Sequence, residues 1–290
     1  MRWTFKYVIA ILAVIICTCL VSIWASYFYL ETTYFEYTSP KLSEEIKAVI
    51  LSDIHDHEFG EGNSELIFEV KENEPDIIFV LGDMLNDSSE DYHVAVELTR
   101  ELAEIALTYY ALGNHEISYM ETHGKELQDA LESAGAKILE LESQYIEVKG
   151  QKIRIGGMYD YAFALDGDNT TNPEHMVPEV YEFLRDFQET DDFKLMLSHK
   201  PDAFIFGDAP KTWDIDLVIS GHDHGGQVIL PFVGGLFGGD QGWFPDYVYG
   251  MHSFEKYDML ITRGLGSNPK ILPRFNNRPE VMVLTMEPEE

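Results

Sequence analysis

Cysteine is almost absent from this 290-residue sequence. The chain has only two, Cys17 and Cys19, and both lie in an apolar run near the N-terminus. A disulfide framework or a cysteine-based zinc site is therefore excluded from the rest of the chain. The fold must be stabilised by its hydrophobic core, and a bound metal would have to be held by His, Asp or Asn side chains.

Positive charge is also scarce. The sequence has 20 basic residues against 51 acidic ones, which gives a formal net charge of −31. Nucleic-acid binding depends on basic side chains that displace counterions from phosphates, and no basic stripe is present here. The same deficit argues against general electrostatic docking onto anionic lipid. The acidic balance is typical of a soluble, self-repelling surface.

The one long apolar run, residues 7–30, is almost free of charge. As a helix it would be about 36 Å long at about 1.5 Å per residue, enough to cross a hydrocarbon core of about 30 Å. The candidate cleavage site around Ile23-Trp24-Ala25 is poor, because a bulky residue stands where a secretory signal has a small one. We therefore expect an uncleaved anchor; a cleaved signal and, third, a buried core helix are the alternatives.

Charges at the two ends of this run predict its orientation. Arg2 and Lys6 precede it, whereas Glu31 and Glu36 follow it. The positive-inside rule then keeps the N-terminus in the cytoplasm and places the remaining chain outside. We expect a single-pass membrane protein whose folded domain is extracytoplasmic.

The chain divides into three parts in this interpretation. Residues 1–30 form a cytoplasmic tip and a transmembrane anchor, residues 31–45 a linker, and residues 46–290 one catalytic domain. Predicted strands at 47–52, 76–81 and 107–112 alternate with predicted helices at 63–71, 90–105 and 125–133, which indicates a partly parallel sheet covered by helices. Further strands are expected at 145–148, 152–156, 194–198, 217–220, 227–230, 259–262 and 281–286. Two packed sheets flanked by helices would accommodate all of them.

Polar side chains follow five of the predicted strands, at the point where each strand ends. They are Asp53, Asp83, Asn114 with His115, His199, and His222 with His224. The carboxyl ends of strands in an open α/β sheet form its binding crevice. Carboxylate, amide and imidazole ligands suit Mn, Fe or Zn better than an all-oxygen calcium site.

These segments read D-x-H, G-D, G-N-H-E, H and G-H-x-H, and in this order they resemble the calcineurin-like metallophosphoesterase family. The resemblance extends over residues 49–224. The tail Arg263-Gly264-Leu265-Gly266 with Asn277-Arg278-Pro279-Glu280 resembles a membrane- or envelope-associated bacterial branch that includes YaeI-like phosphodiesterases and some UDP-diacylglucosamine pyrophosphatases. The fold that this implies is a four-layer α-β-β-α sandwich of two mixed sheets.

The resemblance also implies a set of roles for the residues. One metal would be held by Asp53, His55, Asp83 and His224, and a second by Asp83, Asn114, His199 and His222. Asp83 would bridge the two ions, which are expected to be manganese, with iron or zinc as alternatives. His115 is not needed as a ligand and is expected to protonate the leaving oxygen. Glu116 would either orient His115 or cap a helix at the surface.

The expected activity is hydrolysis of a phosphodiester, phosphomonoester or pyrophosphate by a hydroxide that bridges two metals. An envelope or lipid-linked substrate is favoured, with no nucleic-acid partner. A nucleotide-directed phosphatase and a non-catalytic metal-binding scaffold are the alternatives.

Several features near these motifs carry open interpretations. Lys200 would contact substrate phosphate or point to solvent. Asp223, between His222 and His224, would orient a ligand or repel an anionic substrate. His57 and the segment 159–161 would face the cleft, and the Gly- and aromatic-rich segment 234–249 would be a packed loop or a lip toward a lipid-linked substrate or the membrane surface.

Overall fold

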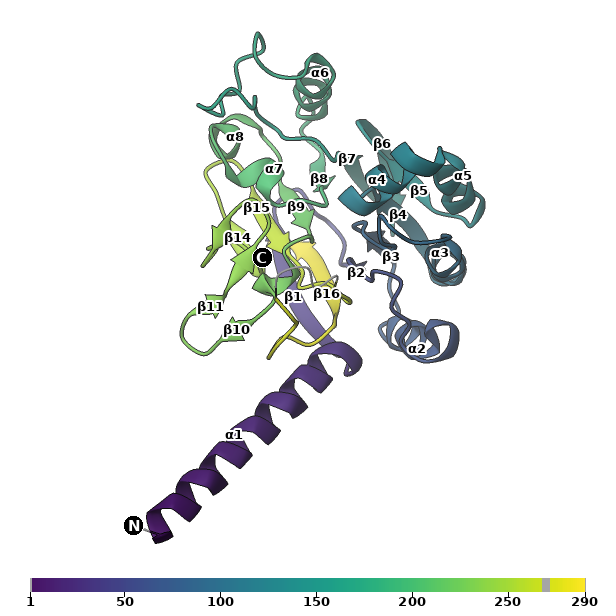
Figure 1. The fold of residues 1–290 in the computed structure, drawn as a ribbon. Coiled ribbons are helices and arrows are strands. Elements are labelled where there is room, and N and C mark those ends of the chain that lie inside the picture. Colours follow the sequence, from purple (N-terminus) through teal and green to yellow (C-terminus); the bar gives the residue numbers. More distant parts are fainter. Residues whose placement is uncertain (1, 268–271, 290) are drawn as a thin grey trace.

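A computed structural model describes residues 2–267 and 272–289 of the chain. It has two six-stranded sheets that pack face to face, with helices on both outer faces and one long helix that extends away from them (Figure 1). This is the expected mixed α/β sandwich of two sheets.

The first sheet carries the N-terminal half of the domain. Its strands, in spatial order, are β1 (Glu31–Ser39), β16 (Glu280–Pro288), β2 (Ile46–Leu51), β3 (Ile77–Val80), β4 (Leu107–Ala111) and β5 (Lys137–Leu139). Neighbours from β2 to β5 are parallel, β16 runs antiparallel to β2, and β1 is parallel to β16.

The second sheet is built from the C-terminal half. Its order is β14 (Gly250–Ser253), β15 (Asp258–Ile261), β9 (Leu217–Ser220), β8 (Phe193–Leu197), β7 (Gln151–Gly157) and β6 (Glu142–Val148). The four central strands are parallel, and the two edge strands run antiparallel to their neighbours. Four tiny strands, β10 (Ile229–Leu230) with β11 (Gly234–Gly235) and β12 (Phe237–Gly238) with β13 (Gly242–Trp243), form two short hairpins between β9 and β14.

Successive side chains along each central strand point to opposite faces of its sheet, so each strand contributes to two layers of the core. In β2, Ala48 and Ile50 pack into the core between the sheets, whereas Val49 and Leu51 face the outer helices. Both faces are buried, so these strands read as continuous apolar runs.

Helices cover the two outer faces. On the first sheet lie η1 (Glu61–Asn63), α2 (Ser64–Glu72), α3 (His93–Ile105), α4 (Asn114–His123) and α5 (Glu126–Ser133); on the second lie α6 (Pro178–Phe187), α7 (Asp202–Ile205) and α8 (Ala209–Thr212). Helix η2 (His224–Gly226) follows β9. Helix α3 shows why these segments pack as helices: its apolar positions Ala95, Leu98 and Leu102 fall on one stripe, which is buried.

Helix α1 (Arg2–Phe28) leaves the domain at one end (Figure 1). Its segment Lys6–Phe28 is long and apolar enough to cross a membrane, and no residue of its most apolar 18-residue window is buried inside the protein, although Ser26 near its end is buried against the domain. The alternative of a buried core helix is therefore wrong, whereas a membrane span and a signal sequence both fit this segment.

The prediction of a linker over residues 31–45 is wrong. Residues 31–45 contain β1, nine residues that pair in parallel register with β16 from Glu31↔Glu280 to Ser39↔Pro288. The polar and aromatic pattern was misinterpreted because β1 is an edge strand in which only one of nine residues is fully buried and three are exposed. The folded unit therefore begins directly after α1. The sequence prediction also missed α4, α6, β5 and β14.

Candidate metal centre

All seven predicted ligands lie at the carboxyl ends of strands of the two sheets. Asp53 and His55 follow β2, Asp83 follows β3, Asn114 follows β4, His199 follows β8, and His222 and His224 follow β9. Because the parallel strands of both sheets point toward one edge, five segments that are far apart in sequence converge there.

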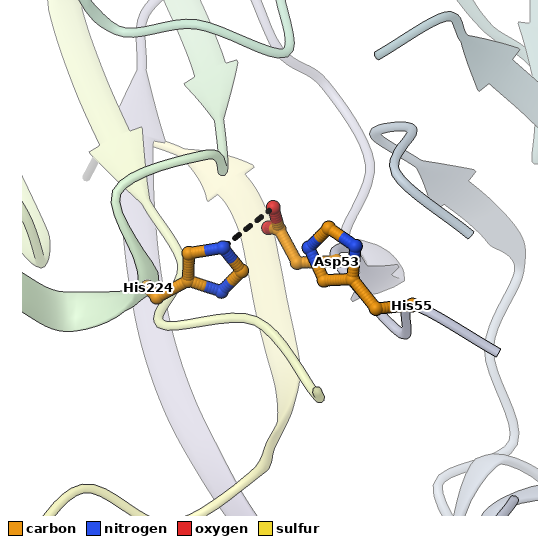
Figure 2. Close-up of side chains that lie close together, drawn as sticks. All are labelled: Asp53, His55 and His224. Carbon is orange, nitrogen blue, oxygen red and sulfur yellow. Dashed lines mark ion pairs between the residues drawn. The ribbon is translucent and has the colours of Figure 1, made fainter. Parts of the chain in front are cut away.

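Asp53, His55 and His224 form the first cluster. Their ligand atoms lie within 4.8 Å of one another. Figure 2 shows the carboxylate of Asp53 between the two imidazole rings, with His224 Nε2 3.8 Å from Asp53 Oδ1. Within residues 2–267 and 272–289, Asp53 Oδ1, both ring nitrogens of His55 and Nδ1 of His224 make no hydrogen bond although they are buried. Buried polar atoms without partners are rare, so this cluster fits a metal ion.

Asp83, His199 and His222 form the second cluster, with Asn114 beside it. His199 Nε2 lies 3.2 Å from Asp83 Oδ2, 3.2 Å from Asn114 Oδ1 and 3.1 Å from His222 Nδ1. His199 Nδ1–H donates to the carbonyl oxygen of Leu81 at 2.5 Å, which leaves Nε2 as the ligand atom. Asp83 Oδ2 also lies 3.9 Å from His55 Nε2, so this carboxylate stands between the two clusters.

Backbone geometry at the site is strained. Asp53, His55, Asp83, His222 and His224 all have positive φ, between 47° and 68°. Such conformations are uncommon outside glycine and persist only where surrounding contacts impose them. Close packing of the neighbouring glycines is part of that constraint, because a Cβ on Gly113 would lie 2.2 Å from Asp83 Oδ1.

Burial and mutual contact shift the pKa values at the site. Burial raises the pKa of Asp53 to about 6 and lowers that of His55 to about 4. Burial alone would raise the pKa of Asp83 and lower that of His199, but their mutual attraction outweighs it, so the Asp83 pKa falls and the His199 pKa rises to about 9. A metal at this position would replace the proton of His199.

Burial, followed by the charge of a neighbouring histidine, lowers the pKa of His222 and that of His224 well below the ordinary value. Neutral imidazole is the form that binds a metal. The donor set of two carboxylates, one amide and four imidazoles therefore suits divalent transition ions.

His115 lies beside the second cluster and is held in one orientation. The backbone N–H of Asp87 donates to its Nδ1 at 2.8 Å, so in the neutral ring the proton is on Nε2. Nε2 lies 3.8 Å from Asp83 Oδ2 and therefore points into the site. This arrangement suits a proton donor.

Glu116 caps a helix, as one of its two expected roles had it, but in the interior rather than at the surface. It is fully buried and accepts hydrogen bonds from the backbone N–H groups of Asp83, Met84 and Gly113 and from the hydroxyl of Tyr110. The bond from Gly113 caps the N-terminus of α4, and the other bonds join the β3 and β4 loops.

Two carboxylates behind His222 were not predicted as a pair. Asp202 and Asp223 have ligand atoms within 4.8 Å of a His222 ring nitrogen, and each has one buried oxygen without a hydrogen bond in the described chain. Asp223 is almost fully buried and accepts a bond from Gln241 at 2.7 Å, so it does not face an incoming substrate. A sequence signal existed: Asp202 follows the predicted ligand His199 by three residues and opens α7.

Lys200 and His57, whose roles the sequence left open, both contact aromatic side chains. Lys200 Nζ stands 4.9 Å from the ring centre of Tyr159 and 5.6 Å from that of Tyr161. The ring of His57 packs against Phe59 and against Phe28 at the end of α1, with 5.7 Å between the centres of His57 and Phe28.

Comparison with known proteins agrees with this geometry. A family model for calcineurin-like phosphoesterases matches residues 46–226. The chain belongs to this family. It is 29% identical over 244 residues to phosphodiesterase YaeI of Escherichia coli, which covers 83% of this chain and 82% of that protein. It is 28% identical over 249 residues to the metallophosphoesterase YkuE of Bacillus subtilis, and this match covers 83% of this chain and 79% of that protein.

Solved structures are more distant. A purple acid phosphatase from yellow lupin seeds has a TM-score of 0.47 and 11% identity, covering 87% of this chain and 55% of that one. Family membership and the ligand clusters together establish a metal-dependent phosphoric ester hydrolase that uses divalent metal ions.

Proposed function

We propose that this protein is a membrane-anchored phosphoesterase that hydrolyses a lipid or lipid-linked phosphate ester outside the cytoplasm. One observation carries the proposal: the candidate metal centre is two hydrogen bonds away from α1. The backbone N–H of Asn277 donates to Ser26 Oγ of α1 at 3.1 Å, and its side-chain amide donates to the carbonyl oxygen of His224 at 2.6 Å.

A second contact supports the same arrangement. Phe28, at the end of α1, packs on His57, two residues beyond the predicted ligand His55. If α1 crosses a bilayer, Phe28 lies near the boundary between lipid and water. The site is then held close to the membrane, where the phosphate of a lipid headgroup can reach it.

The seven residues at the strand ends would hold two divalent cations, with Asp83 shared. Manganese is our first choice, and iron or zinc are alternatives with the same ligand types. When bound, such a pair activates water and neutralises charge on the phosphoryl oxygens.

The chain's own side chains supply the remaining chemistry. His115 Nε2–H can donate a proton to the leaving oxygen, because Asp87 fixes the opposite nitrogen as an acceptor. Glu116 holds the Asp83 and Gly113 loops at a fixed separation, so the shared carboxylate keeps its place.

The test uses the full chain in phosphatidylcholine vesicles with added manganese. We expect turnover of an aryl phosphodiester and, in a substrate screen, faster turnover of lipid phosphates than of nucleotides. Equal or preferred turnover of nucleotides would reject the substrate class. Protease added outside intact cells should reach the domain; full protection would reject the orientation.

A further inference from the structure

We infer that the β10–β11 hairpin, with Phe232 and Val233 at its tip, enters the lipid bilayer beside α1 and holds the catalytic domain against the membrane at a second point. The inference rests on the membrane anchoring in the proposed function and goes beyond it. The partner is the apolar and interfacial region of the leaflet that faces the domain.

Hydrogen bonds fix the hairpin's position along α1. The backbone N–H of Asn276 donates to Ser22 Oγ of α1 at 3.0 Å, and the Asn276 side chain donates to the carbonyl oxygen of Ile229 in β10 at 3.1 Å. An isolated bridge between Val228 and Phe275 adds a second link to the same loop. The base of the hairpin is therefore tied to Ser22.

The depth of Ser22 follows from helix geometry. It lies six residues before Phe28, or about 9 Å along the axis at about 1.5 Å per residue. An interfacial layer on one side of a bilayer is about 5–8 Å thick, given about 30 Å of hydrocarbon within about 40–45 Å overall. With Phe28 near the water boundary, Ser22 lies close to the edge of the hydrocarbon. In Figure 1 the hairpin projects from the side of the domain on which α1 leaves.

The chemistry of the hairpin fits this depth. Residues 227–239 contain no charged residue, in a chain whose net charge is −31. Phe232 is fully exposed and Val233 is 55% exposed, and the two are adjacent at the turn. The neighbouring hairpin continues the surface with Trp243 and Phe244, both more than half exposed. Apolar and aromatic side chains of this kind enter the interface without electrostatic attraction, which this acidic chain does not provide.

A second contact would also control the site. One attachment leaves a domain free to tilt about its anchor, whereas two fix its height and inclination above the lipid. His224 lies in η2, only a few residues before β10, so the hairpin and a predicted ligand belong to one continuous segment. Insertion at Phe232 therefore orients the metal centre toward the headgroups.

Spin-label depth measurements test this on the full chain in phosphatidylcholine vesicles. Cys17 and Cys19 are first replaced by alanine, and a single cysteine is introduced as Phe232→Cys, Val14→Cys or Leu165→Cys. Val14 reports on the anchor, and Leu165 is an exposed apolar control (72% exposed) in the loop between β7 and α6. The readout is collision with dissolved oxygen relative to a water-soluble nickel complex.

Labels at 232 and 14 should favour oxygen, and the label at 165 should favour nickel. A label at 232 that behaves like that at 165, while 14 is buried in lipid, would overturn the hairpin inference alone. An aqueous label at 14 would overturn both the anchor and the hairpin.

A functional arm uses Phe232→Asp with Val233→Asp. Turnover of a phospholipid in vesicles should fall severalfold, while turnover of a soluble aryl phosphodiester stays unchanged, which also confirms folding. Equal retention of both activities would contradict a role for insertion, and so would an equal loss of both.

Discussion

Replacing Glu116 by glutamine tests the framework beneath the predicted metal ligands. Glu116 Oε2 accepts from the N–H groups of Asp83 and Gly113, and Oε1 accepts from Met84 N–H and the Tyr110 hydroxyl. An amide keeps one acceptor oxygen and turns the other position into a donor. The least costly orientation places the NH₂ in the Oε1 position, since the Tyr110 hydroxyl can rotate to accept.

The Met84 N–H then faces another donor in a fully buried place. An unsatisfied buried donor costs about 1–3 kcal/mol. We therefore expect Glu116→Gln to lower the free energy of unfolding by about that amount. The β3 loop that carries Asp83 would also lose part of its support, so metal affinity should fall by about 10–100-fold, as for other residues behind metal ligands.

Urea unfolding and calorimetric titration with manganese measure the two effects. Glu121→Gln is the matched control, because Glu121 lies on the same helix, α4, and is exposed. Wild-type stability together with wild-type metal affinity in Glu116→Gln would refute the reasoning. A stability loss without any change in metal affinity would show that the loop keeps its shape without this carboxylate.

Three other predictions concern single groups or the metals. His115→Asn should lower turnover of an aryl phosphodiester by about 10²–10⁴-fold without changing the metal content measured by elemental analysis, because the role we propose for His115 is that of an acid and not of a ligand. Burial raises the pKa of Glu140 to about 7 from 4.5, so the stability present below about pH 4.5 should be lost as pH rises toward 7. Glu140→Gln should then stabilise the protein at pH 8 by up to about 3 kcal/mol in urea unfolding, because each unit of pKa difference corresponds to about 1.36 kcal/mol, whereas exposed Glu142→Gln should not. Chelation should lower the thermal midpoint, and manganese at about 100 times its Kd should restore about 2.7 kcal/mol; an unchanged midpoint would count against metal binding.

Much of the site could be predicted from sequence because its ligands occur in short contiguous motifs. Asp53, Asp83 and Asn114 each follow an apolar strand, and parallel strands bring their carboxyl ends to one edge. The structure gathers the predicted residues into two clusters.

Residues that support the predicted ligands without being ligands themselves could not be predicted in this way. Glu116 reads as a surface helix residue, since its partners are backbone N–H groups of a different strand end, and the sequence does not show which backbone groups meet. Asp202 lies beside His222 only in the folded chain, and its spacing from His199 does not by itself show this. The orientation of His115 depends on the backbone of Asp87, which no side-chain pattern reveals.

Strand β1 was misassigned for a related reason. Only one of its nine residues is fully buried, so its pattern is polar, and its stability comes from pairing with β16 at the other end of the chain. Local propensity is a weak guide where pairing and burial decide the structure. Helices α4 and α6 were missed because α4 begins on a predicted ligand and α6 follows a long irregular loop.

Backbone strain and unpaired buried polar groups make the site costly in free energy. Positive φ at five of the seven predicted ligands costs free energy, and so do buried carboxylates and imidazoles that lack hydrogen bonds. A hydrogen bond that Glu116 accepts from the Asp83 N–H on one side, and one that Asn277 donates to the His224 carbonyl on the other, hold these loops in place. The second cost would fall if divalent cations neutralised Asp53 and Asp83 and used the free imidazole nitrogens, whereas the backbone strain would remain. Because the framework already holds the predicted ligands in place, the free energy of metal binding would add to stability instead of being used to order the loops.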